Sequence, residues 1–188
     1  DLRQILKACR GRLAMMTVAP EIKGVLNIIP VLRKNNVVVS LGHSNATYEE
    51  AQKGLGKGIA HATHIFNAMP QLHHRAPGPL AAIFEDRNCS VQLITDGVHI
   101  HPSIVRLLIR IIGTERVVLI TDSMSSAGLK DGQYVYNGLN YVSRKGTARY
   151  HDGTLIGTSL TLMEIVRRAM KLAGISLNEA VKMASYNP

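Results

Sequence analysis

Five segments of this chain share one pattern, a short apolar run that ends in a residue able to bind a metal ion or move a proton. A continuous run of Val, Ile and Leu is typical of a strand buried on both faces, as in a parallel sheet covered by helices. The carboxyl ends of such strands meet at one edge, where a (β/α)8 barrel builds its active site. The pattern therefore predicts an α/β enzyme. The runs end at Glu21, His43, His64, Asp96 with His99, and Asp122.

Helix patterns with ordinary start signals lie between and after these runs. Two open with a capping box, in which a Ser or Thr and a Glu three residues later satisfy each other's free backbone N–H groups. Another opens with proline at the first helical position, where no N–H group is needed. The alternation of strands and helices favours a parallel sheet. The predicted helices cover about residues 47–55, 102–112, 159–173 and 176–185.

Residues 131–158 break this alternation. An Asn137-Gly138 turn between segments with alternating aromatic residues predicts a β-hairpin, and His151-Asp-Gly153 predicts a second turn. A hairpin inserted after the last strand of a barrel lies at the catalytic mouth, so we interpret it as a cover over the substrate.

Only about five βα units are present, whereas a closed barrel needs eight strands and typically ~250 residues. We therefore expect residues 1–188 to form a partial (β/α)8 barrel, about strands 4 to 8, without the first barrel strands. The alternative is an open doubly wound sheet of five strands, which also places ligands at the strand ends.

The composition of the chain argues against nucleic acid as a partner and against a membrane span. The net charge of +9 is spread along the chain, and two Phe with no Trp leave little for stacking on bases, which argues against a nucleic-acid partner. No apolar stretch approaches the ~18 residues of a membrane span. Cys9 and Cys89 make no disulfide framework and suit a reducing cytosol, so we expect a cytoplasmic enzyme.

The strand-end residues suggest metal-assisted hydrolysis. Neighbouring strands lie ~4.8 Å apart, so His43 and His64 can reach one cation. Imidazole suits zinc, with iron or manganese as alternatives. Beside such an ion, Asp122 can accept a proton from the attacking water and pass it to the leaving group. Arg75 is a candidate phosphate ligand, with a solvated surface loop as the alternative, and Asp96 to His99 are candidates to position a hydroxyl or a phosphate.

Six segments in one order, covering nearly the whole chain, closely resemble the N-acetylglucosamine-6-phosphate deacetylases of the amidohydrolase superfamily. Any one segment would be modest support, but the ordered set is specific. The segments are GHSNATYEEA (42–51), ATHIFNAMPQ (62–71), RAPG from Arg75, DGVHIHP (96–102), LITDSMSSAG (119–128) and GTLIGTSLTL (153–162).

The resemblance implies a (β/α)8 barrel with a small flanking β-domain, a homodimer and a divalent metal ion. It implies hydrolysis of N-acetyl-D-glucosamine 6-phosphate to D-glucosamine 6-phosphate and acetate, in cytoplasmic amino-sugar metabolism. Carried over by position, His43 and His64 are the implied metal ligands and Asp122 the implied catalytic acid/base. The implied substrate contacts are Asn67, Ala68, Arg75, Asp96, Gly97, Val98, His99, Leu155, Ile156 and Gly157, with Arg75 and His99 on the phosphate.

This sequence also departs from the family. The metal-binding Glu of the family belongs to a His-Leu-Glu-Gly-Pro segment that is absent here, and we interpret Glu21 as a supporting residue. A two-histidine site binds metal weakly, so we expect residues 1–188 alone to be inactive. The flanking β-domain is expected to be absent too. Two alternatives stay open, namely another amidohydrolase such as a cyclic amidase or deaminase, and a non-catalytic basic binding module.

Overall fold

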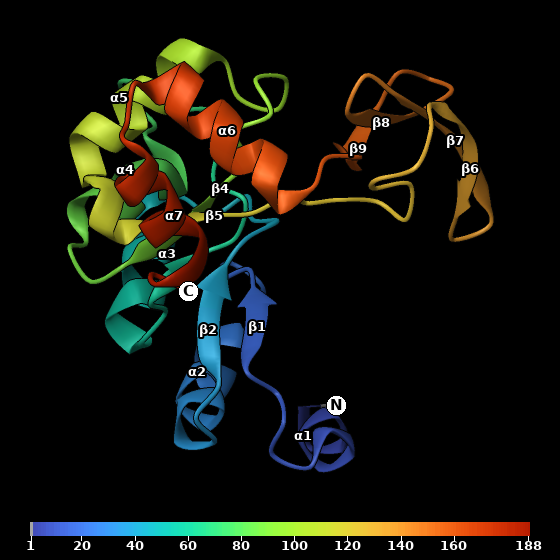
Figure 1. Ribbon diagram of the computed structural model, residues 1–188. Helices are drawn as coiled ribbons and strands as arrows, with labels where there is room; N and C mark the ends of the chain where they lie inside the picture. The colour runs from blue at the N-terminus through green and yellow to red at the C-terminus, as the bar shows by residue number, and fades with distance from the viewer. Residues whose placement is uncertain (1) are drawn as a thin grey trace. The chain divides into compact units, whose positions relative to one another are not determined.

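The computed structural model describes residues 2–188 (Figure 1). The chain divides into two compact units, with the boundary between Gln92 and Leu93. All five apolar runs form strands, as predicted, in the sheet order β1-β2-β3-β4-β5, and β1 to β4 pair in parallel. The strands are β1 (Met15–Val18), β2 (Val38–Leu41), β3 (His61–Ala62), β4 (Ser90–Leu93) and β5 (Val117–Leu119).

The register of the first unit decides where the strand-end residues lie. Val18 of β1 pairs with Leu41 of β2, Leu41 with Ala62 of β3, and Ala62 with Val91 of β4. All four residues are buried, with exposed fractions of 8% or less. The strands therefore end at the same level, and the residues that follow them project from one edge of the sheet.

Four helices belong to the first unit, and α3 packs against both α2 and α4. The predicted capping box of α3 is present, since Thr47 and Glu50 satisfy each other's backbone N–H groups. The helix continues to Lys57 and ends at Gly58, whose φ is +114°. The other three were not predicted, because α2 has no side-chain cap and contains Pro30, while α1 and α4 are only eight residues long. The helices are α1 (Leu2–Cys9), α2 (Val25–Lys34), α3 (Tyr48–Lys57) and α4 (Gly78–Glu85).

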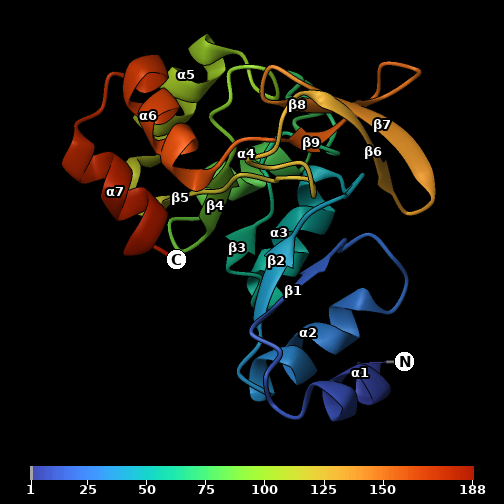
Figure 2. The same ribbon diagram turned by 45° about the vertical axis from the view of Figure 1, so that its right-hand side comes forward.

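In the second unit, helix α5 packs on α6, α6 on α7, and α7 on β5 (Figure 2). The prediction that α6 begins near residue 159 is wrong. It begins at Leu162, because the capping box that starts it joins Thr161 and Glu164. The elements are α5 (Pro102–Ile112), a short 3₁₀ turn (Thr114–Arg116), α6 (Leu162–Ala173) and α7 (Leu177–Ser185).

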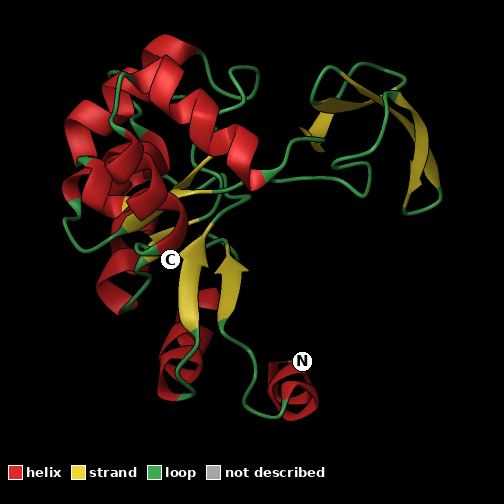
Figure 3. Ribbon diagram, viewed as in Figure 1, coloured by secondary structure: helices red, strands yellow, loops and turns green. Residues whose placement is uncertain are grey.

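The second unit also contains a separate antiparallel sheet, with strands in the order β6-β7-β8-β9 (Figure 3). The Asn137-Gly138 turn joins β6 to β7 with positive φ at both residues, as a two-residue hairpin turn requires. The predicted turn at His151-Asp-Gly153 joins β8 to β9, and the sheet also continues from the predicted hairpin into β8 because Lys145 and Gly146 make another two-residue turn. The strands are β6 (Gly132–Tyr136), β7 (Leu139–Arg144), β8 (Thr147–Tyr150) and β9 (Leu155–Thr158).

No helix within residues 2–188 has the length and apolar character needed to cross a membrane.

Candidate active site

The two predicted metal ligands lie together at the edge of the first unit's sheet. The Nε2 atoms of His43 and His64 are 2.9 Å apart, and the rings meet edge to face with centroids 4.7 Å apart. Because Leu41 of β2 pairs with Ala62 of β3, the residues two positions beyond each of them, His43 and His64, lie side by side. Both histidines have a positive φ, +48° and +28°, which is uncommon for residues other than glycine and tends to occur at functional sites.

Glu21 supports the loop that carries His43. One carboxylate oxygen accepts a hydrogen bond from the Ser44 hydroxyl at 2.7 Å, and the other accepts one from the Asn45 backbone N–H at 2.6 Å. The Ser44 backbone N–H in turn donates to the carbonyl of Ala68 at 3.1 Å. Glu21 therefore links the end of β1 to the two residues that follow His43, which agrees with a supporting role.

Asn67 and Gln92 support the loop that carries His64. The side-chain nitrogen of Asn67 donates to the carbonyls of His64 and Ile65, at 3.0 and 3.2 Å. The side-chain oxygen of Gln92 accepts the backbone N–H of His64 at 3.3 Å. Asn67, predicted to contact substrate, thus also fixes the backbone of a predicted metal ligand.

Two pockets border this region. One, of about 440 Å³, is lined by His43, Asn45, Ala68, Met69 and Pro70.

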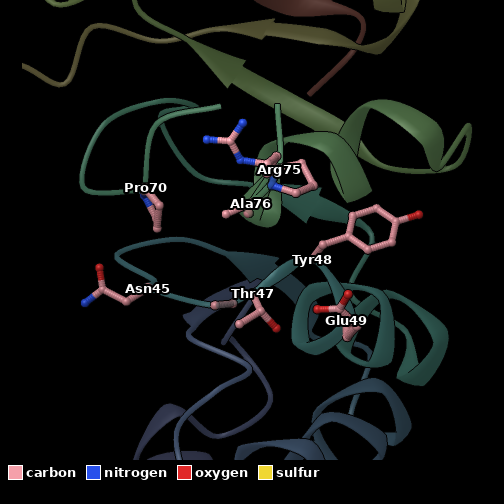
Figure 4. Close-up of a pocket in the computed structure, with 10 residues that line it drawn as sticks. Asn45, Thr47, Tyr48, Glu49, Pro70, Arg75 and Ala76 are labelled. Carbon is pink, nitrogen blue, oxygen red and sulfur yellow. The ribbon is translucent and has the colours of Figure 1, made fainter. Parts of the chain in front are cut away.

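The other, of about 340 Å³, has Arg75 on one side and Asn45 and Thr47 on the other (Figure 4). One Nη atom of Arg75 lies 2.7 Å from the Nε2 of His74. Since a guanidinium has five N–H donors, Arg75 retains capacity to bind an anion.

Asp96 and His99 form a pair in the second unit. One oxygen of Asp96 lies 2.7 Å from the Nδ1 of His99, and the other accepts the backbone N–H groups of Val98 and His99, both at 2.9 Å. Burial favours a higher pKa for Asp96, but these hydrogen bonds outweigh it and hold the pKa below its usual range. The ionised carboxylate therefore favours a His99 ring that carries a proton on Nδ1.

Asp122 follows β5, has a φ of +46°, and is exposed. Its backbone carbonyl accepts the N–H of Thr158 at 2.9 Å, which places it beside the predicted substrate-contacting segment Leu155–Gly157 of β9. The sequence reasoning missed Thr158, although it adjoins that segment.

His61 is buried and was given no role from the sequence. Its Nδ1 lies 2.6 Å from the Ser90 hydroxyl, and burial lowers its pKa to about 4, so the imidazole is neutral at pH 7.

Comparison with known proteins identifies the family. The sequence profile described as the amidohydrolase family matches residues 14–188. The chain belongs to this family. Among curated amidohydrolase relatives, it is 37% identical to the N-acetylgalactosamine-6-phosphate deacetylase of Escherichia coli O157:H7 over 188 residues, all of this chain and 50% of that protein. It is 34% identical to the N-acetylglucosamine-6-phosphate deacetylase of Lysinibacillus sphaericus over 177 residues, 94% of this chain and 46% of that protein.

Solved structures of similar fold are also deacetylases. A mutant N-acetyl-D-glucosamine-6-phosphate deacetylase from Mycobacterium smegmatis, in complex with N-acetyl-D-glucosamine-6-phosphate, aligns with a TM-score of 0.90 at 35% identity, over 97% of this chain and 48% of that one. The N-acetylglucosamine-6-phosphate deacetylase from Pasteurella multocida aligns with a TM-score of 0.92 at 32% identity, over 100% of this chain and 49% of that one. The parallel α/β fold thus matches TIM-barrel deacetylases. The chain spans about half the length of these relatives.

Amidohydrolases generally depend on a divalent metal ion, and His43 and His64 fit part of such a site. Two nitrogens bound to one ion at ~2.0–2.1 Å lie ~3–3.4 Å apart, close to the 2.9 Å between the Nε2 atoms. Within residues 2–188, no group of three His, Cys, Asp or Glu side chains is arranged to hold an ion.

Proposed function

We propose that this protein hydrolyses N-acetyl-D-glucosamine 6-phosphate to D-glucosamine 6-phosphate and acetate. The observation that carries the proposal is the His43–His64 pair, with Nε2 atoms 2.9 Å apart, at the strand ends of an amidohydrolase-family chain. The names and the bound sugar phosphate of the relatives support the substrate class. The same proposal includes a cytoplasmic homodimer and zinc as the metal, with iron or manganese as alternatives.

We further propose that β1–β5 correspond to about strands 4 to 8 of a (β/α)8 barrel. The flanking β-domain and the first barrel strands then lie outside residues 1–188. The parallel strand order and the structural match to TIM-barrel deacetylases support this assignment. The sheet β6–β9 would be an insertion that covers the substrate.

The proposed roles follow the chemistry of the side chains. A divalent ion held by His43 and His64 would polarise the acetyl carbonyl and make water a better nucleophile. Asp122 accepts the proton of the attacking water and delivers it to the amine nitrogen as the C–N bond breaks. Arg75 and His99 bind the phosphate, and the guanidinium of Arg75 supplies N–H donors for it. The proposed contacts to the sugar and its acetyl group are Asn67, Ala68, Asp96, Gly97, Val98, Leu155, Ile156 and Gly157.

Asp122→Asn tests this assignment in the native enzyme. Asparagine tolerates a positive φ as aspartate does, so the backbone should be preserved while the acid/base group is lost. We expect kcat to fall by about 10²–10⁴-fold, with metal content unchanged. Near-normal kcat would refute the acid/base role, and turnover of dihydroorotate or adenine in place of the sugar phosphate would favour a cyclic amidase or a deaminase.

A second candidate substrate is the galactosamine epimer, because the Escherichia coli relative matched over the whole chain at 37% identity carries that name. Measuring kcat/KM for both N-acetylated hexosamine 6-phosphates separates the two. A ratio of about tenfold or more in favour of the galacto epimer would replace the first assignment with the second.

A further inference from the structure

We infer that Thr158 is a positioning residue for Asp122, holding the backbone that aims its carboxylate. This inference rests on the proposed acid/base role of Asp122.

The backbone of β9 meets the segment that follows β5. The N–H of Thr158 donates to the carbonyl of Asp122 at 2.9 Å, and the N–H of Met124 donates to the carbonyl of Thr158 at 2.8 Å. Ser123 and Thr158 thereby form a parallel bridge. Asp122 is thus fixed from its carboxyl side by one residue of β9.

The side chain of Thr158 fixes the amino side as well. Its hydroxyl donates to the carbonyl of Thr121 at 2.7 Å and accepts the N–H of Leu160 at 3.3 Å. Thr158 is fully buried, so water does not compete for these bonds. One residue therefore binds the carbonyls on both sides of the Asp122 Cα.

Asp122 needs such support for two reasons. Its φ of +46° lies in the left-handed region, which aspartate adopts more readily than most residues but still at a cost in free energy that the surrounding bonds must offset. Asp122 is also exposed, so its direction depends on the backbone more than on side-chain packing. A residue that fixes this backbone consequently fixes the carboxylate.

The backbone of β9 lies very close to Asp122 at Gly157. Its φ is +151°, and a Cβ atom built there would lie 2.6 Å from the carbonyl oxygen of Asp122. Real Cβ atoms do not come so near to backbone, so only glycine allows Thr158 to reach Asp122.

The test compares Thr158→Val, which removes the hydroxyl but keeps the shape, with Thr158→Ser, which keeps the hydroxyl, in the native full-length enzyme. A misplacement of about 1 Å costs about 10²-fold in rate, so we expect Thr158→Val to lower kcat by about 10–100-fold with KM changed less than about threefold. Thr158→Ser should stay within about threefold of wild type, with metal content equal in all variants. Assays are run well below each variant's Tm, so that a loss of kcat reports on geometry and not on unfolding.

Thr158→Ala is the second variant, and it decides the matter if Thr158→Val does not fold. It should show the same signature, a lower kcat at nearly constant KM. A folded Thr158→Val or Thr158→Ala enzyme with wild-type kcat and only a lower Tm would overturn the inference. Asp122→Asn in the same series separates the proposed acid/base role of Asp122 from the positioning role of Thr158. An active Asp122→Asn enzyme refutes the acid/base role. An inactive Asp122→Asn enzyme beside an active Thr158→Val enzyme refutes only the positioning role.

Discussion

Replacing Glu21 with glutamine tests whether this carboxylate supports the His43 loop or binds the metal itself. The substitution keeps the size of the side chain and one oxygen acceptor but removes the charge. In the structure both carboxylate oxygens are engaged by the residues after His43, at 2.6 and 2.7 Å. We therefore expect a loss of loop stability and a weaker metal site, but not the loss of a ligand.

The size of the effect follows from those two bonds. Hydrogen bonds to a charged acceptor contribute ~1.5–3 kcal/mol each, and neutral ones ~0.5–1.5 kcal/mol. Because Glu21 is half-exposed, we take the lower part of the difference, about 2 kcal/mol for the pair. Over 188 residues that would lower Tm by ~4–8 °C, and in a native enzyme about twice as long it should lower Tm by roughly half as much. This loss of about 2 kcal/mol is comparable to the typical ~1–3 kcal/mol cost of a left-handed backbone such as that of His43. Without the two bonds, the loop should therefore leave that conformation.

The assay is zinc competition titration of the native enzyme together with thermal unfolding. We expect Glu21→Gln to weaken zinc binding by ~10–100-fold, as loss of a residue that orients a ligand does, while the site still fills at saturating zinc. Glu49→Gln, on an exposed residue of α3, controls for the lost charge and should leave zinc affinity unchanged. An unchanged Tm with unchanged zinc affinity would refute the supporting role, and complete loss of zinc, as expected for His43→Ala, would show that Glu21 is a ligand.

Three further outcomes are expected. Burial lowers the pKa of His61 to about 4, so as pH falls the unfolded chain is protonated at this position before the folded one. The contribution of His61 to folding stability is therefore fully present above pH ~6.5 and declines toward pH 4 by up to ~3 kcal/mol. In urea unfolding at several pH values, His61→Gln should lack this decline. Arg75→Ala should raise KM for the phosphorylated sugar about tenfold or more and leave unphosphorylated N-acetylglucosamine little affected, while equal losses on both sugars would assign Arg75 a structural role. Thr161→Ala should destabilise α6 by ~1 kcal/mol in urea unfolding, and no change would contradict the capping geometry.

Local signals predicted much of this fold. The capping boxes at Thr47 and Ser176 each need only residues three positions apart, and both are present. The proximity of His43 and His64 also follows from sequence, because successive parallel strands in register bring their ends together.

Contacts between distant segments were not predictable. Nothing near Glu21 indicates that it will bind the backbone of Asn45, and nothing near Gln92 indicates that it will accept the N–H of His64. The turn at Lys145-Gly146 lacks the Asn or Asp that marks such turns, so the continuation of the sheet into β8 was missed. These contacts form only once distant segments have been brought together in the folded sheets, so no short stretch of sequence indicates them.

The left-handed backbone at His43, His64 and Asp122 has a consequence for how such a chain can be improved. Each position would be more relaxed with glycine, which has no Cβ to oppose a positive φ. Selection for thermal stability alone would therefore favour replacement of the very side chains that the proposed chemistry requires. To stabilise this protein and keep it active, these three residues must remain in their strained backbone conformations. Stabilising substitutions should instead be placed elsewhere, for example at exposed helix positions.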